Sequence, residues 1–412
     1  MDQLSPLTDE PFGEAGTPGS LSEKLVISPS MQIEQSDPQT VTIYLRSAGT
    51  RLRIPRALYE LLLKFEIPQS LASIAGSNLR VASAIERLRD KGFLLGEGDA
   101  EQSPHRLVTD PPVRLFDCPA HKLAPSATDL VVVGIPYDLS DRAAAGARQG
   151  PSALRETSLQ LLYGIDRRTG QPHGWFDADL ARPILRGVTI GDCGDVFVDP
   201  GERQAQLFAR IAAILGKVTG GGSLPVLLGG DAAIGFPAIE LLQARLPLAV
   251  IRIGGAAPHI AAPHASFVSP STLPARVLAL PGVRRYVHVG AGERPGGIQS
   301  GLATVTAPRF RREGMAALEQ CLDDGMRVYV GLDLDALVAP GDADGPESAH
   351  FAYAELHALL CGIGERYTIA GFDLVGANPL RPGWGATAMT AVHLLLTGLS
   401  AAKDRRGAEA RS

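Results

Sequence analysis

Asp333 and Asp335 are the two residues whose type and spacing best suit chemistry. They follow the apolar run Val328-Tyr329-Val330, so we expect a strand that projects both carboxylates from one face. Open α/β sheets bind ligands at the carboxyl ends of their strands, and carboxylate oxygens suit hard divalent cations. The pair therefore predicts a residual site for one divalent ion such as Mn²⁺, to which His259 or His264 could add a ligand.

A purely structural role is the alternative for the same four residues. The two aspartates would then be hydrogen-bonded to backbone amides or to an arginine, and His259 and His264 would be ordinary loop residues. A metal or acid–base role needs partners that converge in space, and the sequence alone does not display such partners.

The composition excludes several other classes of protein. The 412 residues carry a net charge of −5, which argues against a broad surface for nucleic acid or for an anionic membrane. There is no signal peptide and no apolar run of the roughly 20 residues that span a bilayer, so we expect a cytoplasmic protein without membrane contacts. The spacing of the cysteines favours buried free thiols over a zinc site or a disulfide scaffold: Cys118, Cys193, Cys321 and Cys361.

Apolar strand runs alternate with helical stretches from residue 129 onward. This alternation predicts βα units and hence a parallel sheet with helices on both faces, a three-layer αβα fold. Asp333 and Asp335 would lie at the end of the sixth run. The seven runs are Leu130-Val131-Val132-Val133, Val188-Thr189-Ile190, Val226-Leu227-Leu228, Ala249-Val250-Ile251, Tyr286-Val287-His288-Val289, Val328-Tyr329-Val330 and Thr368-Ile369-Ala370.

A small domain with its own pattern precedes the αβα region. Residues 1–39 predict a flexible tail, residues 97–125 a linker and residues 401–412 a second tail. Residues 40–96 predict a hairpin, three helices and a closing strand, which is the order of a winged helix.

Residues 40–96 resemble the small winged-helix domains that recognise precursor peptides in ribosomal peptide natural-product pathways. The resemblance is carried by the element order and by the ending Leu88-Arg89-Asp90-Lys91-Gly92-Phe93-Leu94. It implies contact with a peptide or a protein. DNA binding and simple dimerisation are the alternatives, although the negative net charge does not indicate a basic surface for nucleic acid.

Five segments of the αβα region together form an ordered pattern: Gly134-Ile135-Pro136-Tyr137-Asp138 with the following Gly146–Arg155, Gly191-Asp192-Cys193-Gly194-Asp195-Val196, Leu227-Leu228-Gly229-Gly230-Asp231, Gly331-Leu332-Asp333-Leu334-Asp335, and Gly371-Phe372-Asp373-Leu374-Val375 with Asn378-Pro379 and Thr387. By these five segments, residues 126–400 resemble the ureohydrolase family, which includes arginases and agmatinases. The resemblance implies that family's fold and, in its active members, hydrolysis of a guanidinium by hydroxide held between two manganese ions.

Most of the metal ligands that this resemblance implies are replaced. Of the six ligand positions, only Asp333 and Asp335 keep an acid, and the acid that would hold the guanidinium is replaced by Gly376. His264 matches the family's proton-transfer histidine. The ligand positions without a donor side chain are Ala232, Gly254, Ala256 and Pro258.

We therefore expect a catalytically degenerate arginase-like protein, without a cofactor, that binds a peptide or protein partner as an accessory subunit of a pathway. The resemblance also implies a homo-oligomer. Two alternatives stay open. One is a divergent hydrolase of a guanidino, amidine or amide group, with one metal ion or none, and the other is a DNA-binding regulator that uses the winged helix.

Overall fold

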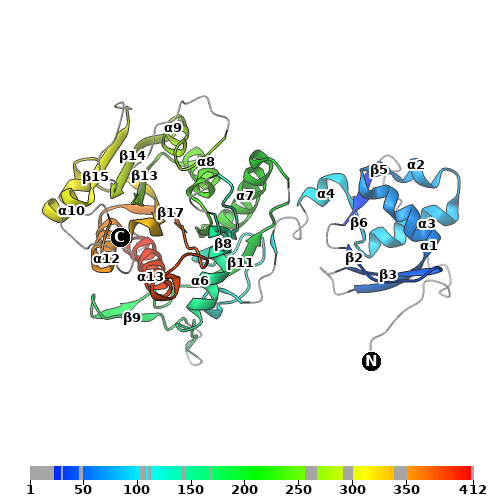
Figure 1. The fold of residues 1–412 in the computed structure, drawn as a ribbon, viewed down its shortest axis with the longest axis horizontal. Helices are drawn as coiled ribbons and strands as arrows, with labels where there is room; N and C mark the ends of the chain where they lie inside the picture. Colours follow the sequence, from blue (N-terminus) through cyan, green and yellow to red (C-terminus); the bar gives the residue numbers. More distant parts are fainter. Residues whose placement is uncertain are drawn as a thin grey trace. The chain divides into compact units, whose positions relative to one another are not determined.

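The chain forms two compact units, residues 1–108 and residues 109–412. The computed structural model describes residues 23–28, 31–45, 50–102, 108–109, 113–140, 145–166, 169, 171–199, 201–255, 267–290, 300–337 and 350–409. Figure 1 shows the helices and strands of both units.

The first unit contains two small antiparallel sheets, with the orders β2-β3-β4 and β5-β1-β6. The predicted hairpin is present, because Val41 pairs with Ile54 and Ile43 pairs with Leu52. The elements are β1 (Lys24–Ile27), β2 (Met31–Ser36), β3 (Thr40–Leu45), β4 (Thr50–Pro55), α1 (Arg56–Leu63), η1 (Lys64–Glu66), β5 (Gln69–Ser70), α2 (Leu71–Ala75), α3 (Leu79–Asp90), β6 (Leu94–Gly96) and α4 (Glu97–Gln102).

Two helices of this unit begin at residues suited to a helix start. Pro55 is the residue before α1. The side chain of Asn78 accepts hydrogen bonds from the backbone N–H groups of Arg80 and Val81, at 3.1 and 3.2 Å, and so caps α3. Ile85 and Leu88 of α3 are then buried in the core of the unit.

Two predicted boundaries are wrong. Residues 24–36 lie in the predicted tail, yet they form β1 and β2, because the short apolar strand around the buried Leu25 pairs with both β5 and β6. The predicted linker of residues 97–125 contains α4 and η2 (Leu115–Asp117), and Leu115 and Phe116 are fully buried in the core of the second unit. The first unit therefore has more strands than the predicted winged helix, and the second unit begins before residue 126.

The second unit is built on a nine-stranded sheet with the order β15-β14-β13-β16-β17-β12-β8-β11-β7. The eight strands from β15 to β11 pair in parallel, as the βα alternation predicts. These strands are β8 (Leu130–Ile135), β11 (Ile190–Val196), β12 (Leu224–Gly229), β13 (Leu248–Gly254), β14 (Val283–Gly290), β15 (Leu302–Thr306), β16 (Arg327–Asp333) and β17 (Thr368–Val375), and β7 (Val108–Thr109) lies at the edge.

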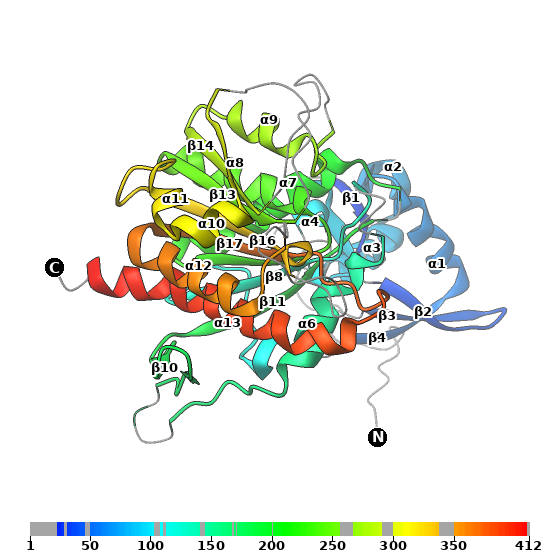
Figure 2. The same ribbon diagram turned by 60° about the vertical axis from the view of Figure 1, so that its left-hand side comes forward.

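Helices cover both faces of this sheet, which confirms the three-layer αβα fold. Figure 2 shows α7 (Gln204–Val218), α8 (Gly235–Arg245) and α9 (Leu273–Leu278) on one side and α6 (Gly150–Ser158), α12 (Tyr353–Arg366) and α13 (Trp384–Glu409) on the other. The remaining elements are β9 (Trp175–Asp177), β10 (Arg182–Ile184), η4 (Ala147–Gln149), η5 (Thr219–Gly221), η6 (Ala232–Ile234), α10 (Ala307–Glu313), α11 (Ala316–Glu319) and η7 (Leu334–Ala336).

The last helix, α13, runs past the predicted end of the domain. Residues 401–409 were predicted to be a tail, but they continue the helix because Ala401 and Ala402 are buried in the sheet-covering core. Among the described residues, the stretch Trp384–Lys403 is the one long and apolar enough to cross a membrane, and 67% of its most apolar window is buried inside the protein. It packs on β17 and α12, which is the position of a core helix.

Candidate functional site

Three adjacent strands place a polar row across the sheet, just below its carboxyl edge. Arg252 on β13 is in register with Gly331 on β16, and Gly331 is in register with Asp373 on β17. Residues in register on parallel strands project from the same face, so the side chain of Arg252 reaches Asp373 across the bare backbone of Gly331. His288 on β14 extends the row on the other side of Arg252.

The guanidinium of Arg252 contacts two carboxylates of this region. Its Nη1 donates a hydrogen bond to Asp373 Oδ1 at 2.7 Å, and its Nη2 lies 3.6 Å from Asp333 Oδ2. Arg252 is 5% exposed and Asp373 is fully buried. Burial opposes the charge of Arg252, but the two carboxylates more than offset this effect and raise its pKa above the ordinary value, so the guanidinium stays protonated.

Gly331 provides the space through which this arginine passes. A Cβ atom at residue 331 would lie 2.3 Å from Arg252 Nη1 and 3.0 Å from Asp373 Oδ1, closer than side-chain atoms can approach. Any other residue at this position would displace the guanidinium. The glycine and the arginine are therefore structurally coupled.

Asp333 and Asp335 lie together at the carboxyl end of β16, but the strand ends at Asp333 and Asp335 lies in the short helix η7, so the prediction of one strand that carries both carboxylates is wrong. Asp333 Oδ1 accepts a hydrogen bond from Asp335 N at 3.1 Å, and Asp335 Oδ1 accepts one from Gly255 N at 2.9 Å. Burial and the charge of Asp335 raise the pKa of Asp333, while Arg252 acts in the opposite direction. Asp333 thus has a backbone-amide and an arginine partner, and Asp335 has a backbone-amide partner, as the structural interpretation expects.

Of the replaced positions that the structure describes, Gly254 and Gly376 lie beside this acid pair. Gly254 ends β13, and a Cβ atom there would lie 3.4 Å from Asp335 Oδ1 and 3.8 Å from Asp333 Cβ. Ala232 is buried in η6. Gly376 has φ +78°, and a Cβ atom there would lie 2.3 Å from Asp333 Oδ1. Four further predicted positions lie outside the described residues: Ala256, Pro258, His259 and His264.

The described residues do not fit a pair of metal ions. Two carboxylates remain at the ligand positions, Asp333 and Asp335, and the first already faces a buried cation. Within the described part of the chain, the one group of three potential ligands with atoms inside 4.8 Å is Asp177, Asp179 and His357, which is a different cluster. No reaction step is therefore assigned to a binuclear centre.

A cavity of about 270 Å³ opens beside the acid pair. It brings Asp335 and Gly376 together with three residues that sequence reasoning missed, His350, Arg381 and Trp384. Only tertiary structure places His350 in the wall, whereas Arg381 and Trp384 follow the Asn378-Pro379 segment closely enough for sequence proximity to have suggested them. The full lining is Leu334, Asp335, Leu337, His350, Gly376, Asn378, Arg381, Pro382, Gly383, Trp384 and Thr387.

Two of the matched segments meet beside this cavity and support its wall. Asn378 Nδ2 donates to the carbonyl oxygen of Ala145 at 2.9 Å, and Asn378 Oδ1 accepts from Leu380 N at 3.0 Å. Asp138 Oδ2 accepts from the N–H groups of Gly146 and Arg148, at 2.7 and 3.2 Å. These polar side chains hold turns in place, which is the role expected of an aspartate or asparagine beside glycine.

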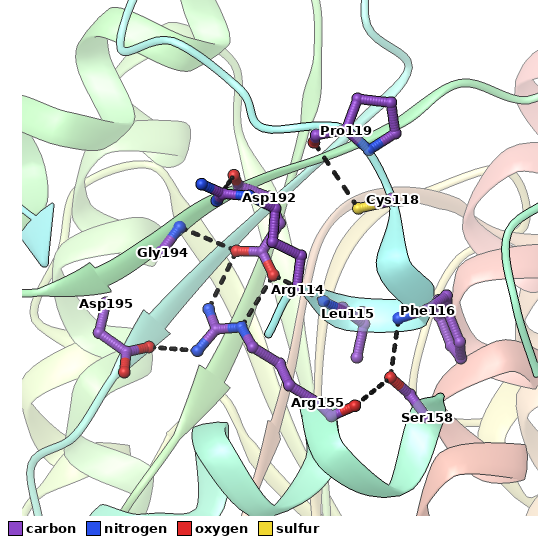
Figure 3. A network of polar contacts seen from close by, with 10 residues as sticks. All are labelled: Arg114, Leu115, Phe116, Cys118, Pro119, Arg155, Ser158, Asp192, Gly194 and Asp195. Carbon is purple, nitrogen blue, oxygen red and sulfur yellow. Dashed lines mark hydrogen bonds and ion pairs between the residues drawn. The ribbon is translucent and has the colours of Figure 1, made fainter. Parts of the chain in front are cut away.

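Other matched acids form a buried ion-pair network with Arg155, drawn in Figure 3. Asp192 accepts two hydrogen bonds from Arg155, at 2.8 and 3.0 Å, and further hydrogen bonds from the N–H groups of Leu115 and Gly194. Asp195 Oδ1 accepts from Arg155 Nη1 at 2.5 Å. The network connects α6, β11 and the segment before β8, so these residues hold elements together.

The fold and site define a three-layer αβα protein with a cavity at the carboxyl edge of its parallel sheet. The sequence pattern of the arginase family matches residues 128–400, so the chain belongs to the arginase family. The ureohydrolase resemblance of the sequence is thereby confirmed.

Characterised relatives and solved structures agree with this assignment. The chain is 26% identical over 296 residues to proclavaminate amidinohydrolase of Streptomyces clavuligerus, covering 66% of this chain and 88% of that protein. It is 29% identical over 292 residues to formimidoylglutamase of Halobacterium salinarum, covering 65% and 87%. A crystal structure of a hypothetical agmatinase from Burkholderia thailandensis has a TM-score of 0.59 at 22% identity, covering 74% of this chain and 93% of that one, which shows the shared fold.

Proposed function

We propose that this chain is an arginase-family protein that binds a ligand or partner and does not perform manganese-dependent hydrolysis. The observation that carries the proposal is the position of Gly254. A Cβ atom there would lie 3.4 Å from Asp335 Oδ1 and 3.8 Å from Asp333 Cβ, so the glycine adds no donor at a position that faces both acids, and the His288 ring lies beside the same space with Cε1 at 3.4 Å. A hydroxide held between two ions needs several converging anionic ligands, and two carboxylates do not supply that set.

The electrostatics of the site support the same proposal. Arg252 already neutralises part of the acid cluster, and a cation placed beside Asp333 would be repelled by that guanidinium. Gly376 also provides no carboxylate at the position where the family resemblance places the acid that holds a guanidinium. The cavity itself persists beside these changes, with Asp335, His350 and Arg381 in its wall.

Metal content and hydrolytic assay test this proposal together. Protein purified without chelator is analysed for manganese by mass spectrometry and is then assayed with arginine, agmatine and a peptidyl arginine in the presence of Mn²⁺. We expect less than about 0.1 ion per chain and no urea above the protein-free blank, because few ligands remain. Two bound ions together with urea release would contradict the proposal.

A divergent hydrolase is the second candidate, and one observation favours it. Asp335 and His350 line the same cavity, and a carboxylate with an imidazole can move protons without a metal pair. Hydrolysis of amidines or amides that is lost in both Asp335→Asn and His350→Gln variants would support this candidate. An inert wild-type protein across those substrates would exclude it.

The peptide or protein partner is proposed for the first unit. The sheet order β2-β3-β4 places β4 at an edge, and an edge strand can accept an extended peptide. Native mass spectrometry of the full chain purified from its own cells, at several concentrations, tests for a stoichiometric partner and for a homo-oligomer. A bare monomer at every concentration would contradict both.

A further inference from the structure

We propose that the Arg252 guanidinium is a resident substitute for the metal charge of the arginase-family site. The inference rests on the proposed function, because it assumes that the site holds no metal pair. It adds the reason why the fold tolerates the loss: an internal cation compensates the acids that remain. Its elements are the arginine, the glycine that admits it, and the carboxylates that it faces.

Charge compensation is required at this place. Asp373 is fully buried, and Asp333 lies on the neighbouring strand only two residues further toward the sheet edge. A buried carboxylate without a partner is strongly destabilising, since the charge has lost its hydration. Arg252 supplies the partner for Asp373 at 2.7 Å and lies 3.6 Å from Asp333. One side chain therefore serves two acids of different strands.

The surroundings of the ion pair make other sources of positive charge scarce. Asp373 Oδ2 is buried and points toward Gly235, at the beginning of the eleven-residue helix α8. A helix N-terminus favours a negative charge but supplies only part of one compensating charge. Tyr286 and Tyr329 lie in the same buried region and stay protonated, because burial raises the pKa of each hydroxyl above its ordinary value. Arg252 supplies a full positive charge to both Asp373 and Asp333.

The space around the guanidinium indicates that Arg252 and Gly331 depend on each other. Arg252 and Gly331 are neighbours in register, and a Cβ atom at 331 would lie 2.3 Å from Nη1 and 3.1 Å from Cδ of the arginine. Any side chain at 331 would therefore force the guanidinium of Arg252 to move. This steric requirement is independent of the charge argument and leads to the same residue.

The central experiment replaces Arg252 with methionine in the full chain and measures melting temperature and Mn²⁺ binding, the latter by electron paramagnetic resonance of the free ion. Without the guanidinium, Asp333, Asp335 and Asp373 leave net negative charge at the site. We expect R252M to melt roughly 5–15 °C lower than the wild type. We expect it to bind Mn²⁺ at least about ten-fold more tightly than the wild type and to regain stability with Mn²⁺, whereas the wild type does not respond.

Arg155→Met is the matched control, because Arg155 is an equally buried arginine paired with two aspartates outside the family site. It should lose stability without gaining a comparable Mn²⁺ response. Equal Mn²⁺ responses in R252M and R155M would overturn the proposal, because any pair of aspartates that had lost its arginine would then bind the ion. An R252M protein as stable as the wild type, or a folded R252M without tighter Mn²⁺ binding, would also overturn it.

Gly331→Ala provides a second route if R252M does not fold. Its methyl group should push the guanidinium off Asp373 and produce the same Mn²⁺ response in a chain that keeps the arginine. An unchanged melting temperature and Mn²⁺ affinity in G331A would contradict the proposed coupling. These outcomes differ from those that would contradict the proposed function. In that case the wild-type protein itself would contain bound manganese and release urea.

Discussion

Arg155 and Asp192 form a fully buried two-point ion pair, with Nε to Oδ2 at 2.8 Å and Nη2 to Oδ1 at 3.0 Å (Figure 3). The carboxylate oxygens of Asp192 also accept hydrogen bonds from the backbone N–H groups of Leu115 and Gly194. A carboxylate so completely bonded is suited to joining elements of the fold and leaves little capacity for an external ligand.

Replacement of Arg155 should therefore be costly even when a cation is kept. We expect R155M to lower the free energy of unfolding by about 3–5 kcal/mol, because Asp192 and Asp195 lose their partner inside the core. R155K keeps the charge but cannot form the two-point pair, so its loss should be smaller but clear. Urea denaturation of the three proteins measures the difference, and an R155M protein of wild-type stability would contradict a structural role.

The ion pair between Arg311 and Glu355 should make stability depend on pH. Arg311 Nε donates to Glu355 Oε1 at 2.7 Å, and Arg311 Nη2 donates to the carbonyl oxygen of His350 at 2.5 Å, so the pair braces the cavity wall. Burial alone would raise the pKa of Glu355, but Arg311 and the N–H of Ala352 lower it below the ordinary 4.5. Its contribution to stability is thus complete above pH 4.5 and is lost as the pH falls through the lower folded-state pKa.

The variant Glu355→Gln tests this dependence. At pH 7 it should be roughly 1–2 kcal/mol less stable than the wild type, and the difference should shrink as the pH falls below 4.5 and through the lower folded-state pKa. Thermal melts across that range provide the measurement. Glu365→Gln, on the exposed side of the same helix, serves as the control and should change stability by less than about 0.5 kcal/mol at any pH. A difference for E355Q that does not vary with pH would contradict the assigned ion pair.

Two of the four free cysteines should be inert in the folded protein. Cys118 and Cys193 are buried. Burial, reinforced by the charge of Asp192, raises the pKa of Cys193 to about 12 and also raises that of Cys118. We expect a disulfide reagent at pH 8 to modify no more than Cys321 and Cys361 in the native protein and all four thiols after denaturation. Rapid native modification of Cys193 would contradict the described packing.

Restoring the family's guanidinium-binding acid at residue 376 should fail. Gly376 has φ +78°, a left-handed conformation that side chains rarely adopt, and the new Cβ atom would lie 2.3 Å from Asp333 Oδ1. We expect Gly376→Glu to cost roughly 1–3 kcal/mol of stability and to release no urea from arginine or agmatine. Melting temperature and a urea assay test this, and urea release by G376E would mean that the site needs only the missing acid.

Much of the fold could be predicted from the sequence because its signals are local. The seven apolar runs all lie within or overlap parallel strands, and Asp333 ends one of these strands as expected. The strand β15 (Leu302–Thr306) was missed because only part of it is apolar. The strand β1 was missed because the composition of the preceding residues suggested a tail.

The sequence by itself determined which donors are missing, because an alanine or a glycine cannot ligate a metal in any conformation. Only the tertiary structure decided what compensates for the loss. Arg252 and Asp373 are 121 residues apart in the chain and meet because β16 lies between their strands with glycine at the crossing point. Such a contact depends on strand order and register, which are set by long-range packing and leave no mark in the local pattern.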